Sequence, residues 1–368
     1  MNQLRPLTPA QFVALAANPF AVDDMAVRPT AASPICVVDL RAAAINSTVG
    51  DADHAGVLES VGAWPVVVVG LIDSAAQPPS PLVDACDTLL GSHPSLPAAE
   101  GPAPDQLAAA ISASPVASVA LAQLLRFSPG LPVREALRAE SLTYSVLQSG
   151  PTHANWLASR STIAPSPAPS SSSTADQPAV IIQRCPGTSN GDGDALQVQL
   201  NRPEVHNAFS AEMRDGLGEA LRVAAADPSI GRVRISGRGP SFCAGGDLRE
   251  FGQAPDPATG HLARMARHPG QFMHLAGATT AVSAHLHGVA VGAGIELSAF
   301  ATEVTATSDT EIWLPEVAMG LIPGAGGTVS IPRRIGRHRT MFMALTGQRI
   351  RRDTAVSWGL VDRLVQPG

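Results

Sequence analysis

Gly292-Ala-Gly-Ile-Glu296 is the stretch that decides the fold of the C-terminal half, because it joins glycine-rich backbone to a carboxylate within apolar sequence. A second glutamate follows in Leu314-Pro-Glu-Val-Ala-Met-Gly320. The chain between Glu296 and Glu316 is long enough for one helix and one short strand, which can bring both carboxylates to one pocket. Burying two carboxylates without partners is costly, so their surroundings favour a function or a fixed hydrogen bond for each.

A tight turn upstream of this stretch, Ser241-Phe-Cys-Ala-Gly-Gly-Asp247, follows a strand expected at 232–236. Its two consecutive glycines remove side chains where a ligand must approach the backbone. We expect the N–H of Ala244 to point into the pocket, with the N–H of Ala293 as a second donor at the start of the glycine-rich helix. A helix N-terminus suits a developing negative charge. Asp247 is expected to hold the turn through side-chain to backbone hydrogen bonds.

Size and composition limit the kind of protein that this chain can be. With 368 residues, of which 45% are hydrophobic, it is long enough for two domains that each bury a core. No apolar run reaches the length of a membrane span, and no signal-peptide pattern is evident at the N-terminus. The four cysteines lack the spacing of a zinc knuckle or a disulfide framework, which predicts a reduced, cytoplasmic setting.

Charge and residue usage exclude several classes of function. The net charge of −6 gives no reason to expect a nucleic-acid partner. The sequence contains no lysine, so all 25 cationic residues are arginine. A Schiff-base lysine, a pyridoxal-phosphate site and a Walker-type phosphate loop are therefore excluded. No metal site is expected, because no third ligand at a suitable spacing accompanies His285 and His287.

A Pro- and Ser-rich segment at 161–178 is predicted to be a linker between an N-terminal domain, 1–160, and a C-terminal domain, 179–368. The order of elements expected after the linker, β-β-α-β and then β-α-β-α, indicates a sheet with crossover helices. The C-terminal domain therefore holds the candidate site.

The N-terminal domain is predicted to be a small α/β unit followed by a helical pair. Short buried strands are expected at 35–40 and 65–70, and helices at 106–126 and 133–148. The polar residues of this domain are isolated rather than clustered, and they include Asp39, Asp73, Glu140 and Tyr144. We interpret the domain as a structural or assembly module.

Four motifs of the C-terminal half occur together and in the order found in one superfamily. They are Asn201-Arg-Pro-Glu-Val-His-Asn-Ala-Phe209, Phe242-Cys-Ala-Gly-Gly-Asp247, Gly292-Ala-Gly-Ile-Glu296 and Pro315-Glu-Val-Ala-Met-Gly-Leu-Ile-Pro-Gly-Ala-Gly-Gly-Thr328. Together they resemble the crotonase (enoyl-CoA hydratase/isomerase) superfamily over about residues 179–368. The resemblance implies an α/β fold in which a crotonase-like ββα spiral core follows a smaller α/β plus helical domain.

By this resemblance, the N–H groups of Ala244 and Ala293 form an oxyanion hole around a thioester carbonyl. Glu296 activates the water that attacks Cβ, and Glu316 delivers a proton to Cα. The N–H of Gly324 helps to hold the water. The residues implied in binding the substrate or its coenzyme A are Phe242, Cys243, Gly245, Gly246, Asp247, Leu248 and Gly292.

The resemblance implies a lyase of the enoyl-CoA hydratase type, and the retention of both acids favours hydration. Two alternatives stay open. One is another crotonase-type reaction, such as isomerisation of an enoyl-CoA or hydrolysis of an acyl-CoA thioester. The other is a non-catalytic acyl-CoA-binding or assembly protein. Coenzyme A is part of the substrate, so no separate cofactor is expected. A homo-oligomer, either a trimer or a hexamer, is implied, with no nucleic-acid or membrane partner.

Members of this superfamily typically continue for several helices beyond the last strand, whereas this sequence ends at Gly368. Segments of the N-terminal domain at 114–126, 137–141 and 156–160 loosely resemble those helices. We therefore hypothesise that the N-terminal domain is a degenerate crotonase-like half whose helices complete the C-terminal core. The hypothesis requires contacts between helices within 106–159 and that core.

Overall fold

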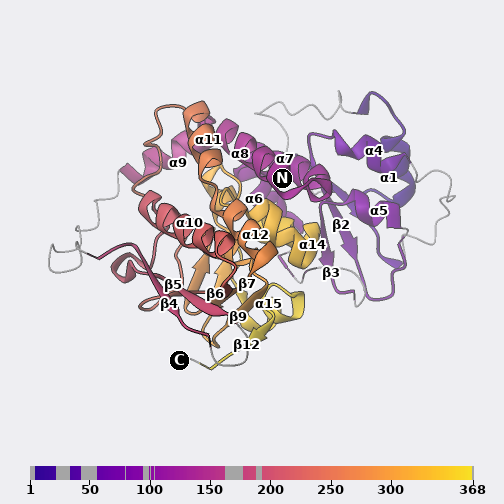
Figure 1. The fold of residues 1–368 in the computed structure, drawn as a ribbon. Coiled ribbons are helices and arrows are strands. Elements are labelled where there is room, and N and C mark those ends of the chain that lie inside the picture. Colours follow the sequence, from indigo (N-terminus) through magenta and orange to yellow (C-terminus); the bar gives the residue numbers. More distant parts are fainter. Residues whose placement is uncertain are drawn as a thin grey trace.

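The computed structural model describes residues 5–21, 34–42, 56–78, 80–93, 99, 101–102, 104–161, 177–187 and 193–366. The expected linker at 161–178 lies almost entirely outside these ranges. Within them, a small α/β unit near the N-terminus, drawn in indigo, lies beside a larger body that contains the C-terminal half (Figure 1).

In the α/β unit, three short strands form a parallel sheet in the order β1-β2-β3. Its elements are α1 (Pro9–Ala16), β1 (Ile35–Asp39), α4 (Val57–Gly62), β2 (Val67–Ile72), α5 (Ser80–Ala85) and β3 (Thr88–Gly91). The strands predicted at 35–40 and 65–70 are confirmed as β1 and β2. Phe12 and Trp64 pack edge to face, with ring centroids 5.6 Å apart, in a hydrophobic cluster made only of residues from this unit.

Four helices follow, α6 (Pro104–Ala113), α7 (Pro115–Phe127), α8 (Val133–Gln148) and α9 (Pro151–Ser161). The single helix predicted over 106–126 is wrong, because the structure has two helices there, separated at Ser114. Pro115 has no N–H to continue the helix, and its ring disfavours helical geometry at Ser114. The helix predicted over 133–148 is confirmed. Of the helices that the structure describes, none alone has the length and apolar character to cross a membrane; residues 104–130 pass that test only as a pair bent by 104°.

The C-terminal half contains two sheets. The larger has six strands in the order β12-β9-β7-β6-β5-β4, of which only the β4/β5 pair is antiparallel. The smaller has the order β11-β10-β8. The strands are β4 (Val180–Cys185), β5 (Asp194–Leu200), β6 (Ile230–Gly237), β7 (Ala281–Leu286), β8 (Val289–Val291), β9 (Glu303–Ala306), β10 (Glu311–Trp313), β11 (Ile350–Arg351) and β12 (Arg363–Leu364).

The helices of this half connect and cover the strands. They are α10 (Ala211–Ala226), α11 (Pro257–Ala266), α12 (Pro269–Thr279), α13 (Ala293–Ser298), the 3-10 helix η4 (Glu316–Met319), α14 (Gly327–Thr346) and α15 (Arg352–Trp358). Ser210 caps α10 by accepting a hydrogen bond from the N–H of Met213 at 3.2 Å. Met213, Leu217 and Leu221 then form the buried stripe of that helix.

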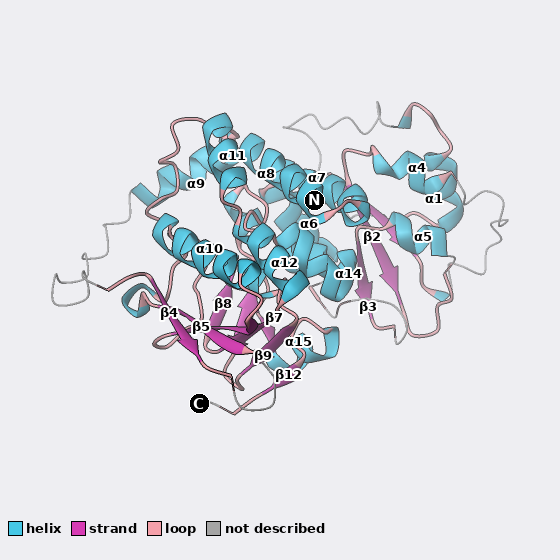
Figure 2. Cartoon of the chain, viewed as in Figure 1, coloured by secondary structure: helices cyan, strands magenta, loops and turns pink. Residues whose placement is uncertain are grey.

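Helices α6 to α8 share one hydrophobic core with the C-terminal half. Leu107 of α6 and Leu121 of α7 belong to the same buried cluster as Leu217 of α10 and Ile295 of α13. Helix α8 contacts α11, α12 and α14, and α7 contacts α14. Figure 2 shows these helices layered over the strands. The contacts required by the hypothesis of a completed core are therefore present, while the origin of the N-terminal domain as a degenerate half stays a prediction.

Candidate active site

A cavity of about 230 Å³ lies where α8, α11 and the start of α12 meet the glycine-rich turns of the C-terminal half. Part of its wall consists of residues that the sequence singled out: Gly246, Asp247, Ala293, Glu296, Glu316 and Gly324. Another part comes from helices, with Tyr144 and Gln148 from α8 and Arg264 from α11. The structure therefore brings both glutamates to one cavity, as the spacing predicted.

Glu296 lies in the first turn of α13 and is buried. Its Oε2 accepts two backbone hydrogen bonds, from Ala325 at 2.7 Å and from Gly327 at 2.9 Å. Burial raises the pKa of Glu296 to about 7, while these two N–H groups oppose that rise by stabilising the ionised form. The carboxylate is thus set to exchange a proton near neutral pH.

Glu316 begins η4, and its Oε2 is buried with no hydrogen-bond partner anywhere in the described part of the chain. Burial raises the pKa of Glu316 well above its ordinary value, and the charge of Glu296 raises it further. The two carboxylates flank Gly292, which has φ +47°. A Cβ at that glycine would collide with Oε1 of Glu316 and lie 3.8 Å from Oε1 of Glu296. Gly292 therefore provides the space in which the two acids approach each other.

The predicted oxyanion donor Ala244 is wrong, because its N–H donates to the carbonyl of His206 at 2.9 Å and the residue is not part of the cavity wall. Phe209 pairs with the turn on either side of Gly246: its N–H donates to Gly245, and its carbonyl accepts from Asp247. In such an extended pairing the intervening N–H faces the other way. Gly246 lies in the cavity wall, and its N–H is unpaired among the residues described.

The other predicted donor is Ala293. It is the first residue of α13, so its N–H has no partner within the helix, and it lies in the cavity wall. Gly246 and Ala293 together offer two N–H groups to one cavity. Two such donors can stabilise an oxygen that gains negative charge.

Five of the residues predicted to bind substrate are not part of the cavity wall. Phe242 and Cys243 are buried in the core, and their N–H groups donate to the carbonyls of His287 and Val289. Burial raises the pKa of the Cys243 thiol to about 12, so it is an unreactive core residue. None of the other three predicted contacts is in the cavity wall: Gly245, Leu248 and Gly292. The turn sequence alone does not show which of its residues face the cavity, and the neighbouring Gly246, Asp247 and Ala293 form the wall.

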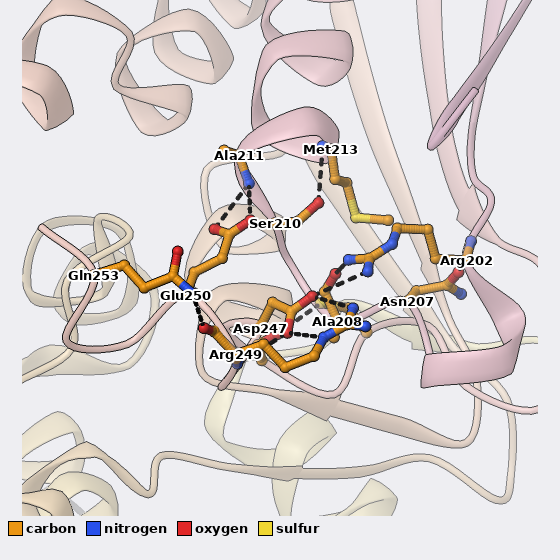
Figure 3. A network of polar contacts seen from close by, with 12 residues as sticks. Arg202, Asn207, Ala208, Ser210, Ala211, Met213, Asp247, Arg249, Glu250 and Gln253 are labelled. Carbon is orange, nitrogen blue, oxygen red and sulfur yellow. Dashed lines mark hydrogen bonds and ion pairs between the residues drawn. The ribbon is translucent and has the colours of Figure 1, made fainter. Parts of the chain in front are cut away.

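Asp247 holds the turn, which confirms its expected role. Its carboxylate accepts hydrogen bonds from the N–H of Arg249 at 3.1 Å and from the side chains of Arg249 and Arg202. The Arg249 guanidinium holds the pKa of Asp247 well below its usual range. Figure 3 shows Asp247 between these two arginines, with Glu250 reaching the N–H of Ala211. The network fixes the turn that presents Gly246.

The part of the site that comes from α8 was not predicted from the sequence. Glu140 is fully buried and accepts hydrogen bonds from Gly326 and Thr328, and Tyr144 lies in the cavity wall. The interpretation of these two as isolated polar residues is wrong. One signal was available, because Glu140 falls on the buried stripe of α8 with Ala136 and Leu137. A charge on such a stripe needs partners.

The predicted absence of a metal site concerns clusters of side chains that could act as ligands. Within the described ranges, no three His, Cys, Asp or Glu side chains are grouped so that they could hold a metal ion. His285 and His287 instead contact Thr305 and the carbonyl of Gly239. His285 and Thr305 are paired residues of the neighbouring strands β7 and β9, so that contact is part of the sheet.

Comparison with protein families identifies the motif-bearing half. Residues 191–367 match the family model described as enoyl-CoA hydratase/isomerase. A probable enoyl-CoA hydratase of Rhizobium meliloti (strain 1021) is 34% identical over 170 residues, which are 46% of this chain and 65% of the relative. The mitochondrial enoyl-CoA hydratase of Pongo abelii is 34% identical over 45% of this chain and 56% of its own length.

A longer relative is also matched over only part of its length. The fatty acid oxidation complex subunit alpha of Shewanella amazonensis (strain ATCC BAA-1098 / SB2B) is 37% identical over 47% of this chain and 25% of its own length. This chain therefore spans less than two thirds of each of these relatives. Among solved structures, an enoyl-CoA hydratase of Mycobacterium smegmatis covers 52% of this chain and 71% of its own, with 31% identity and a TM-score of 0.46.

Proposed function

Residues 191–367 of this chain belong to the crotonase (enoyl-CoA hydratase/isomerase) superfamily, and from this premise we propose that the protein is an enoyl-CoA hydratase. The proposed reaction adds water across the double bond of a 2-enoyl-CoA thioester and yields a 3-hydroxyacyl-CoA. Coenzyme A is part of the substrate, and the proposal includes no separate cofactor. It further includes a homo-oligomer, either a trimer or a hexamer, in the cytoplasm.

The observation that supports hydration is the difference between the surroundings of Glu296 and Glu316. Glu296 receives two backbone N–H groups, whereas the buried Oε2 of Glu316 receives no hydrogen bond within the described residues. Hydrogen bonds from N–H groups favour the ionised form, and burial without partners favours the protonated form. Near neutral pH the pair then supplies one base and one acid in one cavity, which is what the addition of water requires.

In the proposed mechanism, Glu296 takes a proton from water as the water oxygen bonds to Cβ of the enoyl group. Electrons of the double bond move towards the thioester carbonyl, and Gly246 and Ala293 donate their N–H groups to the oxygen that becomes negative. Cα then takes the proton of Glu316. The proton on Glu296 restores Glu316 before the next turnover, and the roles reverse for dehydration. The N–H of Gly324, which lies in the cavity wall, is proposed to orient the water.

The test is turnover of crotonyl-CoA in D2O with analysis of the products. Hydration gives a 3-hydroxyacyl-CoA with one deuterium at Cα and consumes the conjugated double bond, which is followed by its absorbance. Isomerisation adds no oxygen, and thioester hydrolysis releases the coenzyme A thiol. A wild-type protein that binds short and long enoyl-CoA thioesters without adding water to any of them contradicts the proposed function.

A further inference from the structure

Two buried carboxylates from distant parts of the chain share the backbone N–H groups of residues 325–328. This segment, called here the loop 325–328, is the end of the loop before α14 together with the first two residues of that helix. Glu296 of α13 accepts from Ala325 and Gly327 at 2.7 and 2.9 Å. Glu140 of α8 accepts from Gly326 and Thr328 at 2.8 and 3.0 Å. Four consecutive N–H groups thus alternate between the two acids.

Glu140 makes one further contact that fixes its orientation. Its Oε2 accepts a hydrogen bond from the hydroxyl of Thr328 at 2.7 Å, in addition to the backbone N–H of the same residue. The side chain is fully buried, so these hydrogen bonds replace those that water would give. Because both carboxylate oxygens of Glu140 have fixed donors, the side chain holds the loop in one position relative to α8.

Glu140 is surrounded by several titratable and charged groups and does not belong to a simple ion pair. Burial, and then the charge of Glu296, raise the pKa of Glu140 to about 8. Glu316 of η4, Tyr144 of α8 and Arg264 of α11 also face it electrostatically. His268, just before α12, lies with Nε2 3.9 Å from Oε1 of Glu140 and is neutral at pH 7, because burial lowers its pKa to about 4.

From this arrangement we infer that Glu140 is a positioning residue for Glu296: it holds alternate N–H groups of the loop 325–328, so that the remaining two stay aimed at the Glu296 carboxylate. The inference rests on the proposed function for the role of Glu296. It assigns to the N-terminal domain a direct part in building the active site. Loss of Glu140 frees two N–H groups and lets the loop shift, and a small displacement of a catalytic base lowers the rate steeply.

The first arm of the test uses the full chain and compares Glu140→Gln with Glu135→Gln. Glu135 is exposed on the same helix, so its substitution leaves the loop unchanged. A glutamine at position 140 turns an N–H2 group towards one of the loop donors. We expect kcat for crotonyl-CoA to fall by roughly 10- to 100-fold with KM changed less than about threefold, as for a misplaced catalytic group. An unchanged kcat overturns the inference.

The second arm needs no turnover and separates this inference from the proposed function. The C=O stretch of protonated carboxylic acids, followed by infrared spectroscopy against pH, reports Glu140 directly, with Glu140→Gln identifying its band. In Glu296→Gln, the ionisation of Glu140 should move to lower pH, because the neighbouring charge that raised its pKa is gone. An unmoved midpoint overturns the inference even where the wild type proves inactive towards every thioester.

A milder variant covers the case in which Glu140→Gln does not fold. Thr328→Val removes one hydrogen bond to Glu140 and keeps the backbone N–H. We expect kcat to fall in the same direction by a smaller factor. A Thr328→Val protein with wild-type kcat and a wild-type infrared titration of Glu140 contradicts the inference.

Discussion

At Glu296, burial and hydrogen bonding act in opposite directions on one carboxylate. Burial raises its pKa to about 7, and the N–H groups of Ala325 and Gly327 limit the rise. Glu316 has no such donors for Oε2, and its pKa lies well above the ordinary value. The residues carry the same functional group, but the backbone around each one decides which form it takes.

This difference predicts a bell-shaped pH profile of kcat/KM. A base must be ionised, so activity should fall as pH drops below the pKa of about 7 of Glu296. An acid must be protonated, so activity should fall again as pH rises past the raised pKa of Glu316. Because the carboxylates interact, the two limbs report the cluster as a whole.

Substitution should separate the two limbs of that profile. In Glu296→Gln the acidic limb of the profile should disappear, and in Glu316→Gln the alkaline limb should disappear. In each variant kcat should fall on the order of 10²- to 10⁴-fold. Steady-state kinetics across pH would measure both. If either variant keeps the wild-type kcat, the substituted glutamate has no part in the mechanism.

The space that Gly292 leaves between the two carboxylates can be tested by substitution. Alanine there needs φ +47°, and its Cβ would collide with Oε1 of Glu316. We expect Gly292→Ala to lose about 1–3 kcal/mol of stability from backbone strain and roughly 10²-fold in kcat from the displaced carboxylate.

The matched control for Gly292 is Gly277→Ala. Gly277 lies in α12, and a Cβ there meets no atom within 4 Å. It should leave kcat unchanged and stabilise the helix slightly. Equal behaviour of the two variants in unfolding and kinetics would contradict the role assigned to Gly292.

Among the elements, α8 shows how much a segment's role depends on what it packs against. Its bounds could be predicted from apolar periodicity, because that pattern is local. Its partners could not, since Glu140 and Tyr144 meet the loop 324–328 only after the chain has folded. The same limit explains the error at Ala244. Which N–H faces the cavity depends on pairing with Phe209, a contact that the turn sequence does not contain.

The contact between α8 and this loop can be measured with a double-mutant cycle. A Cβ on Gly324 would overlap the ring of Tyr144. We expect Gly324→Ala to destabilise by about 1–3 kcal/mol through overpacking. Combined with Tyr144→Ala, the loss should be less than the sum of the single losses, with a coupling of about 0.5–3 kcal/mol.

Urea unfolding would give the four free energies of the cycle. Gly62→Ala in α4 is the control, because a Cβ there meets nothing within 4 Å. Strictly additive losses for Gly324→Ala and Tyr144→Ala would show that the ring does not pack on the loop.

For the whole molecule, one arginine ties the N-terminal α/β unit to the helices that share the C-terminal core. Arg126, at the end of α7, binds Asp87 through Nε at 2.9 Å and Nη2 at 2.7 Å. It also donates to the carbonyls of Val61, Trp64 and Val66. The side chains of Arg126 and Asp87 are 8% and 2% exposed, so the pair is shielded from water.

Breaking this pair should therefore weaken the coupling between the two parts. Arg126→Met removes the near counter-ion of the buried Asp87 carboxylate and leaves only Arg337, whose Nη1 lies 3.9 Å from Oδ1. Losing the near partner of a buried ion pair costs about 3–5 kcal/mol. We expect urea unfolding to become less cooperative, with the α/β unit unfolding first. Arg363→Met breaks an exposed pair with Glu303 and should cost at most about 1 kcal/mol. Similar losses in both variants would contradict the special role of Arg126.

The sharing of one loop by Glu140 and Glu296 has a consequence for how such sequences diverge. A change at position 140 alters the hydrogen bonding of Gly326 and Thr328, although more than 180 residues of the chain separate them. Neutral drift at either place is therefore restricted by the other. In an alignment of proteins with this arrangement, position 140 should covary with positions 326–328, and random mutagenesis of α8 should recover second-site revertants in that loop.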